Sequence, residues 1–368
     1  MAAAPEIPTV DLLDVRSSDD GRRTRAAEAL REGLGTYGLV YVRNHGVAPQ
    51  AVAALYSSFQ RFTSRAPEDK ARYARPDLWY QRGWTPPNTE VAVASGGQPD
   101  LKECYFAAPV AVDEAARLEF PALYPPNVWP EGDDSFREEY LRVGMQLHAA
   151  GEALLVACAR ALSLSDDTFT ARTAGAPHVT RVLRYLPLAP EQVGRGLVWG
   201  EEHTDFNLLT LLPGGQFFGP DGAPSPRPDD KSGLYLRTRG TAENPAGTLV
   251  RGTPPEGCIV AQVGQQLEIL TGGVFQATPH VITAPGAAGY SRLSSAHFVH
   301  LHSSQVLRPL LPFATPEAIR SYAPPVLAGT YDLKTLVDIG LAPRETLDAL
   351  GYRHYDRLAL QRATQREP

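Results

Sequence analysis

The chain has 368 residues, 43% of them hydrophobic and 21% charged, which is typical of a globular protein with a sizeable core. Its formal net charge of -6, without a long basic run, argues against a nucleic-acid partner, and its three widely spaced cysteines argue against a disulfide framework or a thiolate zinc site. Because no secretory signal pattern and no apolar run of membrane-spanning length is present, we expect a cytoplasmic protein with no membrane partner.

The first part of the chain is expected to be rich in helices. Apolar spacing and turn residues predict, in order, a strand, a helix, a strand and a helix over residues 5–14, 22–34, 38–46 and 49–73. The second helix begins at Pro49, a favoured first helical residue. Residues 76–135 are rich in Pro, Gly and aromatic residues without a period, so we expect irregular structure or substrate-contacting loops there.

The next segment predicts one long amphipathic helix that ends near Leu162. Ser135 and Glu138 have the spacing of a capping box, and Tyr140, Val143 and Leu147 share one helical face. After residue 178 the pattern changes to short strands separated by turns, which is typical of an antiparallel sandwich or barrel.

The remaining segments complete a single composite domain. Residues 213–233 are rich in Gly, Pro and Asp and predict a long loop, which in a compact domain is usually functional or disordered. Two helical stretches are expected in the tail. We expect residues 1–368 to form one domain, with a helix-rich region, a β core and C-terminal helices over residues 1–177, 178–303 and 304–368.

One short motif carries the chemistry of the β core. His203 and Asp205 precede the apolar run Leu208-Leu-Thr-Leu-Leu212. If this run is one strand, residues i and i+2 share a face, so the imidazole and the carboxylate point the same way. An isolated H-x-D is more often a solvated surface pair, and only further ligands favour a metal.

His280 is the best third ligand among the remaining histidines. It lies in a predicted strand that can return beside the first one in a barrel. Two histidines and one carboxylate leave three cis positions open on an octahedral metal, which suits non-haem Fe(II). Zinc is the alternative, although zinc sites tend towards closed tetrahedral shells.

Twelve residues later, Arg292 and Ser294 offer an anion anchor. On a strand these two side chains share a face, and a guanidinium fork with a hydroxyl can hold a carboxylate by charge-assisted hydrogen bonds. A bidentate 2-oxoacid on the metal would need such an anchor for its far carboxylate.

The order H-x-D, His in a Thr-Pro-His context, then R-x-S resembles the isopenicillin N synthase-like branch of Fe(II)/2-oxoglutarate-dependent oxygenases. The segments IPTVDL, GLVYVRNHGV, RVLRYLPL and GCIVAQVGQQLEILTGG are similar to the same family, so the likeness covers nearly the whole chain. The resemblance implies a mainly β fold with a helical layer around a double-stranded β-helix, or jelly roll.

The resemblance also implies a reaction and a set of site residues. It implies Fe(II) at His203, Asp205 and His280, and binding of the 2-oxoglutarate cosubstrate at Arg292 and Ser294, with O2 as the other cosubstrate. Where many relatives have Asn-x-Tyr, this chain has Arg184-Tyr185-Leu186, and Tyr185 is the candidate for the other cosubstrate carboxylate. Two further differences from the family are a longer 213–233 segment and a histidine, at position 297, where an aromatic residue is more common.

The expected function is hydroxylation of a small molecule, in secondary or amino-acid metabolism. Desaturation and ring closure are the other outcomes of the same chemistry. One alternative is an oxidase of the same family that uses no 2-oxoglutarate, and another is a non-catalytic jelly-roll binding protein.

Other polar residues near these motifs have simpler interpretations. Glu201 and Glu202 precede the H-x-D motif and can reach a cationic substrate group, although a solvated edge is the more common role. His297, His300 and His302 lie close together in sequence, and we expect core or pocket-wall histidines there rather than a second metal site.

Overall fold

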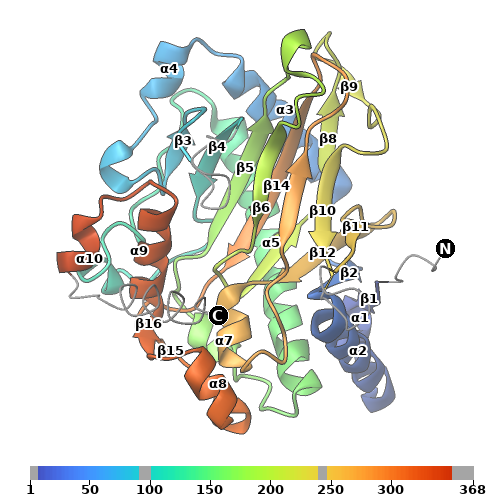
Figure 1. Ribbon diagram of the computed structural model, residues 1–368, viewed down its shortest axis with the longest axis vertical. Coiled ribbons are helices and arrows are strands. Elements are labelled where there is room, and N and C mark those ends of the chain that lie inside the picture. The colour runs from blue at the N-terminus through green and yellow to red at the C-terminus, as the bar shows by residue number, and fades with distance from the viewer. Residues whose placement is uncertain (1–6, 91–100, 239–246, 350–368) are drawn as a thin grey trace, which may run out of the picture.

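A computed structural model describes residues 7–90, 101–238 and 247–349, and it contains two large β-sheets that face each other (Figure 1). The larger sheet has the order β1 (Thr9–Asp11), β2 (Leu39–Arg43), β12 (Cys258–Val263), β7 (Leu209–Leu212), β14 (Ser291–Val299), β5 (Val179–Tyr185), β4 (Lys102–Ala107) and β3 (Gly83–Thr85). It is extended by β8 (Gly215–Phe218), which pairs with β14 and with β9 (Pro224–Ser225). The smaller sheet has the order β11 (Leu249–Arg251), β10 (Gly233–Arg237), β13 (His280–Thr283) and β6 (Val198–His203).

An apolar layer fills the space between the two sheets. Trp199 and Ile282 of the smaller sheet pack with Tyr185 and Phe217 of the larger sheet, and all four are buried. The Trp199 ring stacks on that of Tyr185 at a centroid distance of 5.5 Å. Two sheets packed through such a layer form a sandwich, so the predicted mainly β jelly-roll fold is confirmed.

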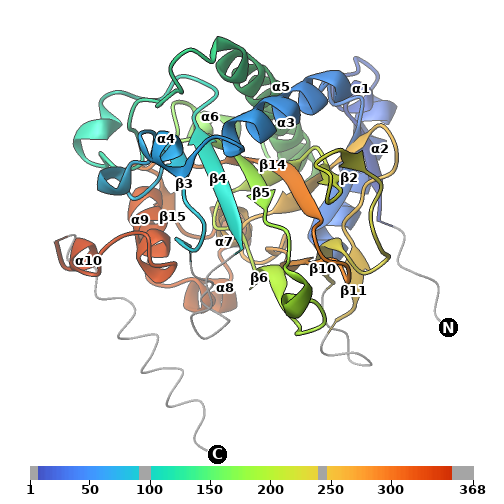
Figure 2. The ribbon, with the colours of Figure 1, turned by 90° about the horizontal axis from the view of Figure 1, so that it is seen from above.

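Helices cover the opposite face of the larger sheet (Figure 2). They are α1 (Leu12–Val15), α2 (Asp20–Glu32), α3 (Pro49–Thr63) and α5 (Asp134–Ala161), with the short α4 (Pro67–Ala71) and α6 (Thr170–Thr173) nearby. Phe59, Phe62, Phe136 and Tyr140 form an aromatic cluster between α3, α5 and β4. This helical layer therefore shields the sheet that carries β14 and β5.

The long helix was predicted correctly, but its N-terminal cap was not. The side chain of Asp133, rather than that of Ser135, accepts the hydrogen bond from the amide of Phe136. The strand predicted over 5–14 is shorter, because the Asp11 carboxylate caps α1 by accepting from the amide of Leu13. The helix predicted over 49–73 divides in two, because Ala66 precedes Pro67 and adopts an extended conformation.

The region 76–135 contains two strands, β3 and β4, that were not predicted, and β4 pairs with β5 over its whole length. Strands β8 and β9 likewise lie within the segment 213–233 that was predicted to be a loop. The helix-rich region and the core share one sheet, because β2 pairs with β12 and β4 with β5.

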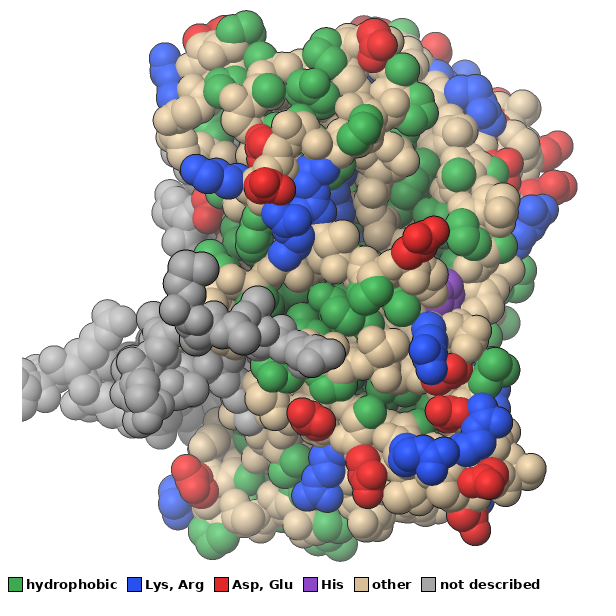
Figure 3. Space-filling model, turned by 90° about the vertical axis from the view of Figure 1, so that its right-hand side faces the viewer, with side chains coloured by type: hydrophobic (Ala, Val, Ile, Leu, Met, Phe, Trp, Pro, Cys, Tyr) green, Lys and Arg blue, Asp and Glu red, His purple; other side chains and the backbone are tan. Residues whose placement is uncertain are grey.

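The C-terminal region packs against the segment 120–124, where Phe120 and Tyr124 form an apolar cluster with Leu333 and Leu336. It contains the helices α8 (Pro316–Ser321), α9 (Ala328–Asp338) and α10 (Glu345–Ala349), and a small sheet of β15 (Val306–Leu307) and β16 (Val326–Leu327). Helix α7 (Gln265–Leu270) follows β12. None of the helices in the described ranges is both long and apolar enough to cross a membrane. On the face shown in Figure 3, acidic and basic side chains are interspersed rather than gathered into one patch.

Candidate metal centre and its two cavities

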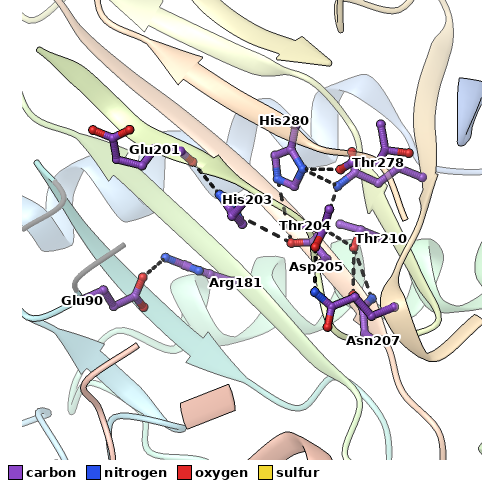
Figure 4. A network of polar contacts seen from close by, with 12 residues as sticks. Glu90, Arg181, Glu201, His203, Thr204, Asp205, Asn207, Thr210, Thr278 and His280 are labelled. Carbon is purple, nitrogen blue, oxygen red and sulfur yellow. Dashed lines mark hydrogen bonds and ion pairs between the residues drawn. The ribbon is translucent and has the colours of Figure 1, made fainter. Parts of the chain in front are cut away.

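His203, Asp205 and His280 come together at one end of the smaller sheet (Figure 4). Strands β6 and β13 pair in antiparallel fashion with His203 opposite His280, so the predicted return of the second strand beside the first is observed. Nε2 of His203 lies 3.8 Å from Oδ1 of Asp205, and Nε2 of His280 lies 3.9 Å from the same oxygen. One candidate ligand atom from each residue lies within 4.8 Å of the other two.

The expected single strand through the H-x-D motif is wrong. Strand β6 ends at His203, Asp205 lies in the connection that follows, and β7 begins at Leu209 in the other sheet. The imidazole and the carboxylate therefore approach each other because the chain turns between the sheets, and not because they share one face of a strand.

Backbone contacts fix the orientation of both imidazoles. Nδ1 of His203 lies 2.7 Å from the carbonyl oxygen of Glu201, and Nδ1 of His280 lies 3.1 Å from that of Thr278. Because a carbonyl oxygen only accepts hydrogen bonds, each Nδ1 carries the proton and each Nε2 keeps its lone pair. Both lone pairs are thus available to a metal. In metal sites, a ligating histidine commonly donates its other ring N–H to a carbonyl or carboxylate oxygen in the same way.

The carboxylate of Asp205 is held in the same way. Oδ2 accepts hydrogen bonds of 2.6 Å from the hydroxyl of Thr210 and from Nε2 of Gln262, which leaves Oδ1 towards the imidazoles. Nε2 of Gln262 also lies 3.4 Å from Nδ1 of His280. Burial opposes ionisation of Asp205, but the two imidazoles and these hydrogen bonds outweigh it and lower its pKa below the usual range.

The protonation states suit a divalent cation. The protein packed around the site and the neighbouring His280 lower the pKa of His203 to about 4, although 48% of its side chain stays open to the cavities that it lines. A neutral imidazole and an ionised carboxylate are the forms that bind metal, so at neutral pH no proton needs to leave His203 or Asp205. Two imidazoles and one carboxylate are a donor set that fits Fe(II).

The predicted anion anchor lies in a cavity of about 590 Å³ that His203, Asp205 and His280 also line. Arg292 and Ser294 are both buried on β14 and both face this cavity. Within the described part of the chain neither side chain has a hydrogen-bond or ion-pair partner, although Arg292 is only 8% exposed. A buried unpaired guanidinium is costly unless an anion joins it, so the cavity fits a carboxylate-bearing molecule.

Two neighbours shape the position of the Arg292 guanidinium. It lies over the rings of Tyr185 and Phe217, at 5.5 and 6.0 Å from their centroids. Gly215 of β8 lies against it so closely that an added Cβ would be 2.4 Å from Nη2 of Arg292. Gly215 is thus required for this approach, and nothing in its local sequence indicated that role.

Tyr185 lies directly opposite Arg292 in the pairing of β5 with β14 and lines the same cavity. Among the described residues its hydroxyl has no hydrogen-bond partner. The predicted cosubstrate residues Tyr185, Arg292 and Ser294 therefore line one cavity together with the three candidate metal ligands, His203, Asp205 and His280, which we call the metal cluster.

A second cavity, of about 740 Å³, meets the metal cluster from the other side, because His203 and Asp205 line both cavities. Where the two cavities meet, the buried Glu90 accepts from Lys102 at 2.8 Å and from Arg181 at 2.7 Å. Burial alone would raise the pKa of Glu90, but the two cations have the larger combined effect and lower it to about 2. The sequence interpretation did not include this ion cluster, because its members are far apart in the chain.

Two family models match the chain over these regions. Residues 7–132 match the N-terminal region of non-haem dioxygenases in morphine synthesis, and residues 177–301 match the 2OG-Fe(II) oxygenase superfamily. The second match spans His203, Asp205, His280, Arg292 and Ser294.

Relatives with named activities extend over most of the chain. A validamycin A dioxygenase from Streptomyces hygroscopicus subsp. limoneus is 27% identical over 336 residues, which is 89% of this chain and 85% of that protein. A homoarginine-6-hydroxylase from Oryza sativa subsp. japonica is 25% identical over 74% of this chain and 77% of its own length.

Solved structures share the fold. A 2OG-Fe(II) oxygenase family protein from Caulobacter crescentus has a TM-score of 0.72 and 25% identity, and the match covers 91% of this chain and all 100% of that one. A full-length protein from Neurospora crassa, solved in complex with alpha-KG, also has a TM-score of 0.72, at 21% identity, over 90% of this chain and 96% of that one. The chain belongs to the 2OG-Fe(II) oxygenase superfamily and is an Fe(II)- and 2-oxoglutarate-dependent dioxygenase.

Proposed function

We propose that His203, Asp205 and His280 hold the catalytic Fe(II) of this enzyme. The observation that carries the proposal is the convergence of two Nε2 lone pairs and one carboxylate oxygen within 4.8 Å. Each side chain is fixed by its second polar atom, through Nδ1 in the two histidines and through Oδ2 in Asp205. Two imidazoles and one carboxylate leave several positions on the metal open for small ligands. Gln262 and Thr210 are positioning residues in this proposal, since they hold Oδ2 of Asp205.

We further propose that the first cavity binds 2-oxoglutarate. Arg292 and Ser294 hold the carboxylate far from the metal, because their side chains face the cavity without partners within the described residues. Tyr185 is the proposed contact for the other carboxylate, through a hydroxyl that is equally free among the described residues. The rings of Tyr185 and Phe217 confine the guanidinium and leave it little freedom to turn away.

In this proposal the second cavity admits the primary substrate, a small molecule. Bound iron supplies oxidative chemistry, in which O2 and 2-oxoglutarate are consumed, succinate and CO2 are formed and a C–H bond of the substrate is oxidised. The protein residues separate the two organic molecules, because His203 and Asp205 lie between the cavities. Hydroxylation of a compound of secondary or amino-acid metabolism is the expected outcome, as the names of the validamycin A and homoarginine enzymes suggest.

We propose that residues 1–368 form a single composite domain, because strands from the helix-rich region form both edges of the large sheet and strands from the core form its middle. We also propose a reducing cytoplasmic compartment, since all three cysteines are unpaired and two of them, Cys104 and Cys158, are buried.

Succinate formation tests the proposed roles. Purified protein with Fe(II), 2-oxoglutarate and O2 should form succinate slowly without a primary substrate, and His203→Ala or Asp205→Ala should abolish this reaction. Arg251→Ala is a suitable control, because Arg251 is exposed and pairs with Asp230 at the surface. Substrate oxidation without succinate would instead identify an oxidase that uses no 2-oxoglutarate, and full activity of the His203 variant would contradict the ligand assignment.

A further inference from the structure

A buried histidine–aspartate pair lies in the wall of the second cavity. His300 follows β14 and Asp332 lies on α9, and both line this cavity. Nδ1 of His300 is 3.6 Å from Oδ2 of Asp332, which is longer than a hydrogen bond, and within the described residues neither atom has a hydrogen-bond partner. The pair is therefore a contact between two atoms that have no other partners.

The surroundings hold this pair in a fixed orientation. Gln266 donates through Nε2 to Oδ1 of Asp332 at 2.8 Å, and its own oxygen accepts from the amide of Leu301. The His300 ring packs on Phe206, the residue after Asp205, with a centroid distance of 5.5 Å. His300 thus lies between Asp332 of α9 and Phe206, which is adjacent to the proposed ligand Asp205, while Gln266 of α7 holds Asp332 in place.

The orientation leaves one imidazole nitrogen for the cavity. Because Oδ2 of Asp332 only accepts when ionised, it favours the proton on Nδ1 of His300 and leaves a lone pair on Nε2. Within the described residues Nε2 has no hydrogen bond. Unlike Nδ1 it is not enclosed by protein, so it is accessible from the cavity that His300 lines. A buried ionisable pair is costly, and replacing it by apolar residues is often stabilising, so packing alone does not explain it.

A second free acceptor lies in the same cavity. Glu201 is two residues before His203 on β6, and Figure 4 shows its carboxylate directed away from the three proposed ligands. Within the described ranges its side chain has no hydrogen bond or ion pair, although its backbone carbonyl orients His203.

The cations of this cavity are already engaged. Lys102 and Arg181 share Glu90, and Lys334 pairs with Asp338. Arg82 donates from both Nη atoms to backbone carbonyl oxygens, and its Nε, which has no partner among the described residues, is enclosed by protein and so is closed to the cavity. The cavity therefore offers a substrate free acceptors at two places, whereas its positive groups are bound to other parts of the protein.

We propose that the primary substrate carries hydrogen-bond donors, as amine or hydroxyl groups, which His300 Nε2 and Glu201 accept while Asp332 sets the tautomer of His300. This inference rests on the proposed function, because it assigns the second cavity to the substrate. The substrate class is an amino- or polyhydroxy-compound rather than a carboxylic acid or an apolar molecule. His300 and Glu201 determine specificity, and Asp332 is a positioning residue.

A panel of paired compounds tests the class directly. Each amine or polyol is compared with its fully methylated derivative, a trimethylammonium compound or a methyl ether, which removes the donors. We expect succinate release above the slow uncoupled rate, and anaerobic calorimetric binding, with free donors, and at least tenfold weaker responses with the methylated partners. Equal responses within pairs, responses to acids or apolar compounds alone, or no response to any donor compound would overturn the inference.

Asp332→Asn tests the positioning role on a compound found in this way. Gln266 holds Oδ1, so the new amide group faces Nδ1 of His300 and donates to it, which moves the imidazole proton to Nε2. The preference for the free donor over its methylated partner should fall at least tenfold, while the KM for 2-oxoglutarate and the melting temperature change little. A retained preference would contradict the proposed tautomer control.

The chain contains a matched control for this variant. His302 and Asp113 form another histidine–aspartate pair, with Nε2 to Oδ2 at 3.2 Å, and neither residue lines either cavity. Asp113→Asn should leave substrate preference unchanged. Uncoupled succinate formation from 2-oxoglutarate alone separates the two levels of failure: its absence contradicts the proposed function, whereas its presence without any response to donors contradicts only the assignment of the substrate class.

Discussion

Replacing Arg292 by Ala should weaken the binding of 2-oxoglutarate more than any other single change in the first cavity. Arg292 is 8% exposed, its guanidinium lies over two aromatic rings, and it has no anionic partner among the described residues. Charge-assisted hydrogen bonds from such a group to a carboxylate are worth about 2 to 4 kcal/mol in total. At about 1.4 kcal/mol per tenfold, the KM for 2-oxoglutarate should rise about 30- to 700-fold.

Succinate formation at varied 2-oxoglutarate concentration measures this effect. Gly215→Ala should act in the same direction without removing any contact, because its Cβ would displace the guanidinium, which is the movable end of a long side chain. Ser294→Ala should raise the KM about tenfold, as expected for one hydrogen bond to a charged group worth about 1.5 kcal/mol. A KM that changes less than threefold in Arg292→Ala, with Arg251→Ala unchanged, would refute the reasoning.

Three further predictions concern residues around the site and in the core. Gln262→Leu should lower the affinity for Fe(II) about 10- to 100-fold in a metal titration, because it removes an outer contact to Asp205; an unchanged affinity would show that this contact is dispensable. Burial, together with neighbouring histidines, holds the pKa values of His178 and His297 well below the usual range, so stability is present above the unfolded pKa of about 6.5 and is lost as the pH falls below it, by up to about 1.4 kcal/mol per pH unit for each ring. Urea unfolding of metal-free protein at pH 7, 6 and 5 measures this loss; His297→Phe should make it shallower, and a flat profile in the parent protein is the contrary result. Glu103→Gln should destabilise the fold by about 3 to 5 kcal/mol in denaturant unfolding, because it leaves the buried Lys70 ammonium without its carboxylate; an unchanged midpoint would contradict this.

The long helix could be predicted because its apolar residues recur with a helical period, and the main core strands because short apolar runs lie between turn residues. Helix α5 buries one face over 28 residues, so its period is clear in the sequence. Strand β4 was missed because Lys102 and Glu103, whose charges are paired inside the protein, shorten its apolar run, although all six of its residues are buried. A strand that is buried on both faces has no alternating pattern to detect.

The metal cluster was predictable from residue types and order, whereas its supporting contacts were not. His203, Asp205 and His280 were expected to meet and do so, although the predicted shared strand face is wrong. The role of Gln262 had one local signal, a polar residue within the apolar strand Cys258–Val263. The contacts of Gly215 with Arg292 and of His300 with Asp332 had none, because they join segments that only the three-dimensional fold brings together.

Anaerobic titration of Fe(II) into the protein with 2-oxoglutarate tests the central claim most directly. When both bind at one centre, a weak visible charge-transfer band should develop and saturate at one iron per chain. His203→Ala, Asp205→Ala and His280→Ala should each abolish the band, while Arg292→Ala should restore it only at higher 2-oxoglutarate concentration. A band that persists in any of the three ligand variants, or that never forms in the parent protein, would contradict the assignment of the metal centre.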